Sequence, residues 1–397
     1  MKNVSIMLNR RVLFDGGMGT QLSARGLAAV CPEMNLVNDF DKVVAIHADY
    51  ASAGATVLTT NTFGANAIKL GKHGLAARAA ELNALGVKAA RQAADAAGGD
   101  VLVALDMGPT GELMSPFGEL TFDRAYAAFR EQADAGRAAG ADLAIIETMS
   151  SLAEGKIAAL AARDAGLPFV LSFTFEASGR TLMGDTPECC AVTAEALGAV
   201  MLATNCSGGP EQMLPIIQRY AASTSLPLLC QPNAGLPQVI NGQTTFPYSP
   251  EAMLEPMRAL IAAGADAIGG CCGTTPAHTA AFSALEFGPK PRPAVGPALC
   301  STREVARISD AQGLAELPLD EAEDFDGESP ALIVNVDGFD ADDALELMES
   351  LTSMVHAPLV FRGEDEAALR ALMNAYAGVP GVIGHADLAR ECGARSL

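Results

Sequence analysis

Short apolar runs alternate with longer Ala-rich segments along the first ~290 residues, and this alternation predicts a parallel β/α fold. The runs expected to be strands lie at residues 11–16, 55–60, 101–106, 142–147, 168–173, 199–205, 227–231 and 265–270. Eight such units favour a TIM (β/α)8 barrel, typically of about 250 residues, over an open doubly wound sheet. The phrases AGAT, AGAD and AAGAD precede the second, fourth and eighth runs, where a glycine ends each helix. The segments 75–97, 122–139, 151–165 and 250–263 are rich in helix-forming residues.

The residues after this predicted barrel differ in composition. Four prolines in the ten residues of GPKPRPAVGP (288–297) exclude helix and sheet there, and ELPLDEAEDFDGE (316–328) is an acidic segment expected to be a solvated loop. The alternation then resumes, with strands expected at 331–337, 358–362 and 382–385 and helices at 341–354 and 364–377. We therefore expect a barrel at 1–288, a linker at 289–330, and a small α/β appendage at 331–397 that packs on the barrel or on a partner.

Composition and charge exclude several classes of function. A net charge of −21 leaves no basic surplus for non-specific binding to nucleic acid or anionic lipid. The apolar runs are too short to span a membrane, and the first residues lack an apolar signal segment, so we expect a cytoplasmic protein without a membrane partner. Nine cysteines without a secretory signal favour metal ligands or buried thiols over a disulfide framework.

Polar and thiol residues follow most of the predicted strands. In a TIM barrel the C-terminal ends of the strands converge on one mouth, so these residues are expected to lie together. They are residues 15–19, 61–64, 106, 108, 147–148, 205–209, 231–235 and 271–272.

Three cysteines belong to this set. Cys206 ends the sixth predicted strand, and Cys271 and Cys272 end the eighth, so the topology is expected to bring them together. Three thiolates suit zinc and leave its fourth position to water or substrate. Such an electron-rich zinc activates water weakly but holds an incoming thiol as a nucleophilic thiolate, which favours alkyl transfer to sulfur. The alternative is that these cysteines are small packing residues.

Two acidic residues at the same mouth need partners. Asp15 lies in a Gly-rich turn whose N–H groups offer a site for a carboxylate, and Glu147 ends an apolar strand where a buried charge needs a counter-charge. An amino acid, with its ammonium and carboxylate, would answer both needs. The alternatives are a turn cap for Asp15 and an internal salt bridge for Glu147.

Six motifs resemble the homocysteine S-methyltransferase family, specifically the homocysteine-binding module of cobalamin-dependent methionine synthases. They are LFDGGMGTQL (13–22), TTNTFGAN (59–66), IIETMS (145–150), NCSGGP (205–210), QPNAGLP (231–237) and GGCCGTTPAH (269–278). The resemblance, which covers residues 11 to about 286, implies that Cys206, Cys271 and Cys272 bind Zn²⁺. Homocysteine sulfur would be the exchangeable fourth ligand, and its methylation would yield methionine.

The same resemblance implies the substrate contacts. Asp15 and Glu147 would contact the homocysteine ammonium, and the backbone at Gly16, Gly17 and Met18 would hold its carboxylate. The asparagine of the TNTF segment, Asn61, would line the pocket.

The methyl donor is open to more than one interpretation. The sequences of the motifs TNTFGAN and CCGTTPAH resemble those of the corrinoid-dependent type. Because no Asp-x-His-x-x-Gly cobalamin signature is present, methylcobalamin is expected on a separate corrinoid protein. One alternative is direct methylation from S-methylmethionine or a betaine-like donor. Another, from a different class, is a non-catalytic zinc- or thiol-binding subunit.

The C-terminal segments ALIVNVDG (331–338) and APLVFRG (357–363) resemble the start of the pterin-binding barrel that follows this module in methionine synthases. Ile333 stands where that family usually has an acid, and Arg362 and Gly363 replace the usual Asp-Ser. We therefore expect a structural remnant that supports the barrel or docks a corrinoid protein, rather than a site for methyltetrahydrofolate.

Overall fold

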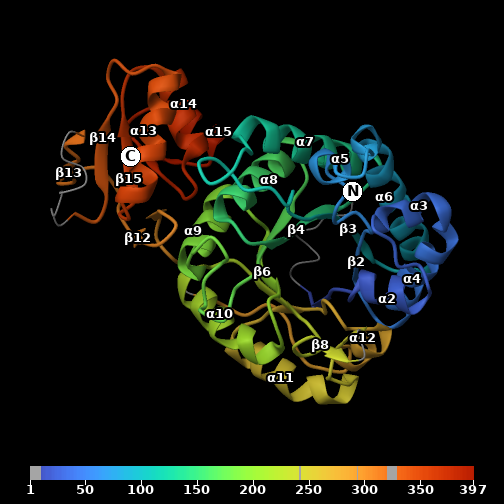
Figure 1. Cartoon of the computed structure of the whole chain (residues 1–397). Coiled ribbons are helices and arrows are strands. Elements are labelled where there is room, and N and C mark those ends of the chain that lie inside the picture. Colours follow the sequence, from blue (N-terminus) through green and yellow to red (C-terminus); the bar gives the residue numbers. More distant parts are fainter. Residues whose placement is uncertain (1–9, 241–242, 293, 320–328) are drawn as a thin grey trace.

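The computed structural model describes residues 10–240, 243–292, 294–319 and 329–397, and its main body is an eight-stranded parallel sheet. The strands are β1 (Val12–Leu13), β2 (Val57–Thr59), β3 (Leu102–Met107), β4 (Leu143–Met149), β5 (Phe169–Phe173), β6 (Met201–Cys206), β7 (Leu228–Pro232) and β10 (Ala267–Ile268). Their order is β1-β10-β7-β6-β5-β4-β3-β2, and a parallel bridge between Phe14 and Val57 joins the two end strands. The predicted TIM barrel and its eight strands are confirmed (Figure 1).

Helices form the outer layer of this barrel (Figure 1). They are α2 (Met18–Ala24), α3 (Asn35–Asn38), α4 (Phe40–Ser52), α5 (Ala67–Gly71), α6 (Ala79–Ala97), α7 (Phe122–Ala138), α8 (Leu152–Asp164), α9 (Pro187–Leu197), α10 (Pro210–Ser223), α11 (Pro250–Ala263) and α12 (Pro276–Phe282), with 3-10 turns η1 (Pro32–Met34) and η2 (Ala76–Arg78). Hydroxyl side chains accept hydrogen bonds from the first turns of α7, α8, α9 and α11, which fixes where these helices begin. Within the described ranges, no helix has the length and apolar character needed to cross a membrane.

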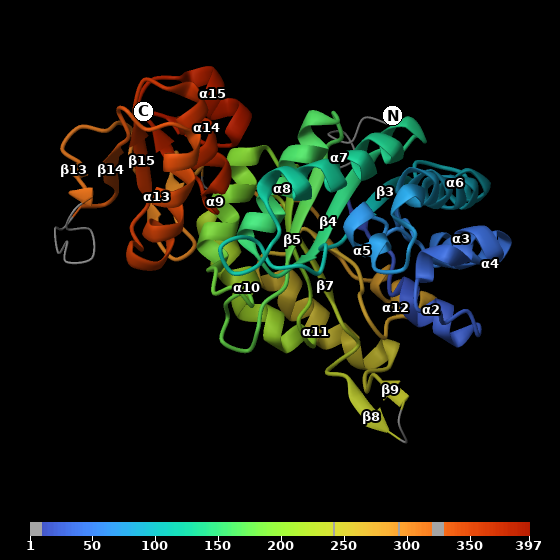
Figure 2. The ribbon, with the colours of Figure 1, turned by 45° about the horizontal axis from the view of Figure 1, so that its top comes forward.

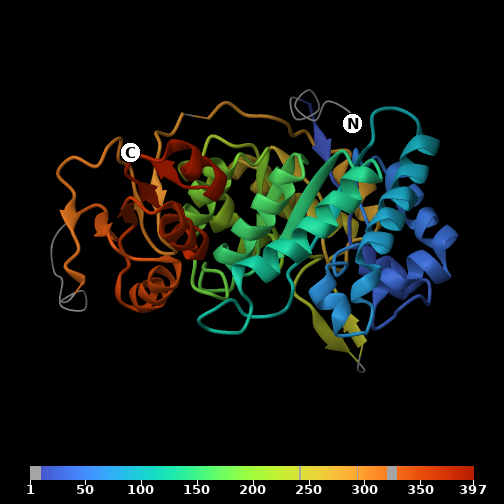
Figure 3. The ribbon, with the colours of Figure 1, turned by 90° about the horizontal axis from the view of Figure 1, so that it is seen from above.

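A hairpin at the mouth of the barrel was not predicted. It consists of β8 (Gln238–Ile240) and β9 (Gln243–Thr245), which pair antiparallel after β7. The hairpin projects from the barrel in Figure 2, and Figure 3 shows it at the same end as the loop that follows β3. Strands of three residues are too short for an alternating pattern to identify.

The C-terminal appendage is an open five-stranded parallel sheet of order β13-β14-β15-β16-β17 beside the barrel (Figure 3). It comprises β13 (Ala315–Glu316), β14 (Leu332–Asn335), α13 (Ala341–Met354), β15 (Leu359–Arg362), α14 (Glu366–Ala375), β16 (Gly381–Val382), α15 (Ala386–Cys392) and β17 (Arg395–Ser396). The three predicted strands and two predicted helices are present. The outer strands β13 and β17 were missed because each has only two residues and is defined by its neighbour.

The segment predicted to be a linker, 289–330, is more structured than expected. It contains the antiparallel pair β11 (Leu299–Cys300) and β12 (Val305–Ala306) as well as β13. The predicted absence of helix and sheet holds for the described part of the Pro-rich segment, 288–292 and 294–297. The acidic residues 320–328 lie outside the described residues.

A buried lysine joins the appendage to the barrel. Lys156 on α8 is only 1% exposed, and its Nζ donates to the backbone oxygens of Met373 (2.8 Å), Tyr376 (2.9 Å) and Gly378 (3.1 Å). These carbonyls lie in the last turn of α14 and just after it, where a cation is favoured by the helix dipole. The barrel thus supplies the cap for a helix of the appendage.

Further contacts hold the appendage in place. The backbones of Cys300, in the segment between barrel and appendage, and Val379 exchange two hydrogen bonds, of 3.0 and 2.9 Å. Arg163 on α8 donates to the backbone oxygens of Arg390 (2.8 Å) and Glu391 (2.6 Å). The appendage therefore packs on the barrel, which is one of the two arrangements expected from the sequence; the other was packing on a partner.

Candidate metal centre at the barrel mouth

The barrel interior changes from apolar to polar toward the C-terminal ends of the strands. Leu102 and Ala104 of β3 and Leu143 and Ile145 of β4 belong to the apolar cluster inside the barrel. Because side chains alternate along a strand, the next inward position on each strand lies one layer nearer the mouth. These positions carry Thr59, Asp106, Glu147, Ser172, Asn205 and Gln231. The mouth therefore has a polar floor on an apolar base.

Three thiols lie together at one side of this floor. Cys206 Sγ is 3.2 Å from Cys271 Sγ and 3.7 Å from Cys272 Sγ, and all three sulfurs lie within 4.8 Å of one another. Two sulfurs on one tetrahedral zinc, each at about 2.3 Å, would be about 3.8 Å apart. Cys272 is exposed and the other two are half-buried, so a ligand can approach from the mouth. The geometry suits one metal ion with three sulfur ligands and an open position.

The local backbone fixes the thiols from both strands. Cys206 and Ser207 have φ of 57° and 55°, in the left-handed region, and the Ser207 hydroxyl accepts a 2.8 Å hydrogen bond from Phe175 N–H. On the other strand, the N–H of Cys271, which follows β10, donates to Pro232 O on the neighbouring β7 at 3.0 Å. A Cβ on Gly17 would lie 2.8 Å from Cys271 O, so glycine is needed there for this close approach.

Asn205, directly before Cys206, links the thiols to two neighbouring strands. It is fully buried, and its Oδ1 accepts from Thr148 N–H (2.8 Å) and the Ser172 hydroxyl (2.7 Å). Its Nδ2 donates to Thr148 Oγ1 (2.7 Å) and lies 3.9 Å from Cys271 Sγ. Asn205 is one of the strand-end residues expected at the mouth from the sequence, where no role was predicted for it; its inward position directly before a candidate ligand was the signal that pointed to one.

The charge balance of the thiols favours a bound cation. Hydrogen bonds from Cys206 and Cys271 lower the pKa of Cys272 to about 3, whereas the Cys206 and Cys272 thiols and burial raise the pKa of Cys271 well above its ordinary value. The three thiols thus stabilise one thiolate and oppose further ionisation. A dication would supply the counter-charge that lets all three ionise.

Two carboxyl groups belong to the same mouth, the buried Asp15 and the half-buried Glu147, whose pKa responds to the charge of Cys272. Asp15 is 2% exposed, its Oδ2 accepts from Thr59 N–H at 2.8 Å, and burial raises its pKa to about 7. Burial, with the charges of Asp15 and Cys272, raises the pKa of Glu147 to about 8. Within the described residues, neither carboxyl group pairs with a Lys or Arg, so the internal salt bridge considered for Glu147 is not present there. A cationic ligand would satisfy both groups.

The remaining residues predicted for substrate binding differ in whether their N–H groups already have a hydrogen-bond partner. The N–H of Gly17 already donates to Thr274 Oγ1 at 3.1 Å, while those of Gly16 and Met18 have no partner within the described chain. Asn61 is buried and its Nδ2 donates to Pro32 O at 3.0 Å, which holds the 3-10 turn η1 before α3. The Asn61 amide nitrogen is therefore already engaged in this structure.

Comparisons with known proteins show the family to which the barrel belongs. A family model described as homocysteine S-methyltransferase matches residues 12–285. The methionine synthase of Mycobacterium tuberculosis is 34% identical over 291 residues, covering 68% of this chain and 24% of the relative. That of Mycobacterium leprae is 32% identical over 308 residues, covering 72% and 25%. The chain spans about a quarter of the length of these curated relatives.

Solved structures of similar fold include the homocysteine methyltransferase MmuM from Escherichia coli. Its metallated form matches with a TM-score of 0.61 at 28% identity, over 71% of this chain and 98% of that chain. Its oxidized form matches with a TM-score of 0.59 at 27% identity, over 69% and 95%.

Proposed function

The chain belongs to the homocysteine S-methyltransferase family, and on this premise we propose that it is a zinc-dependent enzyme that methylates the sulfur of homocysteine to give methionine. The observation that carries the proposal is the group of three thiols within 4.8 Å of one another at the barrel mouth. The existence of a metallated form of the Escherichia coli relative supports a metal-dependent function for this chain.

The residues present fit zinc. Cys206, Cys271 and Cys272 would hold the ion as thiolates, and the exposed side of Cys272 leaves the fourth position open. Bound there, zinc would keep the homocysteine sulfur as a thiolate at neutral pH. The Asn205 amide bridges Thr148 of β4 and the sulfur of Cys271, so this ligand is held in place before the substrate binds.

The protein residues orient the substrate for this reaction. Asp15 and Glu147 accept hydrogen bonds from the homocysteine ammonium, and the N–H groups of Gly16 and Met18 bind its carboxylate. We assign Gly17 a steric role, since its N–H is engaged by Thr274. In the transfer, a sulfur lone pair forms the new S–C bond while the bond from the methyl carbon to the donor breaks, its electron pair leaving with the donor. The thiol proton is released when homocysteine binds as thiolate.

We propose a methyl-corrinoid on a separate protein as the donor. The two curated relatives are methionine synthases, and the motifs resemble the corrinoid-dependent type. Zinc-loaded protein should convert homocysteine to methionine when given methylcobalamin, and should not do so with S-methylmethionine or betaine. Turnover with either onium compound would instead establish direct methylation. Binding of zinc and homocysteine without methionine from any donor would show a thiol-binding subunit.

We propose that the appendage supports the barrel rather than binding a pterin. Ile333 is buried in an apolar cluster, and Arg362, the last residue of β15, forms a 2.8 Å ion pair with Glu316. The buried contacts of Lys156 support the same role. Methyltetrahydrofolate-dependent turnover by the chain with cobalamin alone would contradict it.

A further inference from the structure

A third carboxyl group, Asp106 on β3, lies in the polar floor and is not assigned a role above. It is 6% exposed, and its Oδ1 is buried without a hydrogen-bond partner in the described structure. The backbone around it is fully engaged: its N–H donates to Thr60 Oγ1 (2.9 Å), and its carbonyl accepts from Thr62 Oγ1 (2.8 Å) and Gln132 Nε2 (3.0 Å). The side chain is thus held in place with an unused acceptor.

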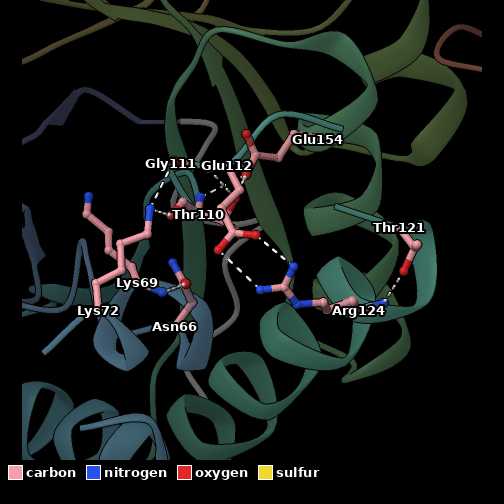
Figure 4. A network of polar contacts seen from close by, with 9 residues as sticks. All are labelled: Asn66, Lys69, Lys72, Thr110, Gly111, Glu112, Thr121, Arg124 and Glu154. Atoms are coloured by element: carbon pink, nitrogen blue, oxygen red, sulfur yellow. Dashed lines mark hydrogen bonds and ion pairs between the residues drawn. The ribbon is translucent and has the colours of Figure 1, made fainter. Parts of the chain in front are cut away.

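The loop that follows Asp106 is fixed by a network of polar contacts, drawn in Figure 4. Both the N–H and the hydroxyl of Thr110 donate to Glu154 Oε1 at 2.7 Å, and Lys72 Nζ donates to Gly111 O at 2.9 Å. Farther along the loop, Arg124 pairs with Glu112 at 2.7 Å. The unpartnered oxygen of Asp106 therefore belongs to a rigid part of the mouth.

The surroundings of Asp106 are acidic. Burial raises its pKa well above the ordinary value, and the charges of Glu147, Asp15 and Glu33 add to this effect. The one nearby cation, Lys69, has its Nζ 4.4 Å above the ring of Phe63 and forms no ion pair with Asp106 in the described structure. An unsatisfied buried polar group costs about 1–3 kcal/mol, so a ligand with N–H donors would remove a standing penalty.

We propose that Asp106 is a further substrate-binding residue that accepts a hydrogen bond from the homocysteine ammonium, together with Asp15 and Glu147. A primary ammonium carries three N–H donors, and the mouth offers one carboxyl group for each. The three groups come from β3, from β4 and from the turn after β1, so they approach the ammonium from different sides. The site therefore selects thiols that carry an unsubstituted ammonium. This inference rests on the proposed function.

Cobalt-substituted protein provides a test that does not depend on turnover. The change in thiolate-to-cobalt absorption measures thiol binding during titration with homocysteine or with 4-sulfanylbutanoate, which lacks the ammonium. Asp106→Asn should weaken homocysteine binding about 10-fold, the value of one charge-assisted hydrogen bond, and leave 4-sulfanylbutanoate unchanged. Glu33→Gln is the matched control: Glu33 is a nearby buried carboxyl group that already accepts from Gly64 N–H at 2.7 Å, and its replacement should change neither affinity by more than about twofold.

Equal weakening of both thiols by Asp106→Asn, or no weakening of homocysteine, would overturn the assignment. Should that variant fold poorly, the wild type gives the answer through N-methylhomocysteine, which lacks one donor and should bind about 10-fold more weakly than homocysteine. Equal binding of these two thiols would again refute the assignment. Failure of the proposed function has a different signature, since the thiolate-to-cobalt absorption of the wild type, which its three cysteines already produce, would then not change on addition of any thiol.

Discussion

Replacing Cys271 with alanine is expected to remove zinc from the protein and to lower methyl transfer by about 10²–10³-fold. A structural zinc site contributes ~10–16 kcal/mol, so each of its ~4 ligands accounts for about 2.5–4 kcal/mol. Cys271 is the less exposed of the two adjacent cysteines, and its sulfur lies beside both Cys206 Sγ and the amide of Asn205. Metal analysis of the purified variant, followed by methionine formation, measures both effects.

The matched control for this experiment is Cys230→Ala. Cys230 is a fully buried thiol on β7 that packs outside the barrel interior, among the residues beneath the helices. Its replacement should leave the zinc content and the turnover unchanged, apart from a small loss of stability from the cavity. Unchanged zinc in Cys271→Ala, or equal loss in both variants, would contradict the assignment of the metal site.

Replacing Lys156 with methionine is expected to destabilise the attachment of the appendage by about 3 kcal/mol. The change removes one ammonium and leaves three backbone carbonyls without their donor. Limited proteolysis should then release the appendage by cleavage in the Pro-rich segment, and thermal unfolding should begin at a lower temperature. Lys72→Met is the matched control, since exposed Lys72 also donates to two backbone carbonyls and should contribute less than about 0.5 kcal/mol.

The stability difference between the wild type and Lys156→Met is expected to depend on pH. Burial lowers the pKa of Lys156 to about 8, whereas an unfolded lysine titrates near 10.4. Between these values the unfolded chain binds more protons than the folded chain, so the wild type gains stability as the pH rises from about 8 to 10. The stability difference between wild type and Lys156→Met should therefore widen over this range. A constant difference from pH 7 to 10 would contradict the lowered pKa.

Most of the fold could be predicted from the sequence because each strand of the barrel is an apolar run followed by a helix. The alternation of Leu102, Ala104 and Asp106 even marks the inward face of β3. The elements that were missed, such as β13 and β17, have two residues each and exist through pairing with a neighbour. Such strands depend on tertiary contacts that a local pattern does not contain.

The candidate site was predictable in part for a related reason. The convergence of strand ends brings Cys206 to Cys271 and Cys272, and the structure shows these thiols together. The lack of a partner for Asp106 depends on every group around it, which no sequence pattern records. Lys156 is a lysine in an Ala-rich helix, and its burial follows from the docking of residues more than 200 positions later.

The central claim is that three cysteines hold a zinc ion whose open position receives homocysteine sulfur. X-ray absorption at the zinc edge, recorded on the full chain before and after addition of homocysteine, tests it most directly. We expect three sulfur neighbours and one lighter atom at first, and four sulfur neighbours at about 2.3 Å once homocysteine binds. A sulfur count that stays at three with saturating homocysteine, or a protein that retains no zinc, would contradict the claim.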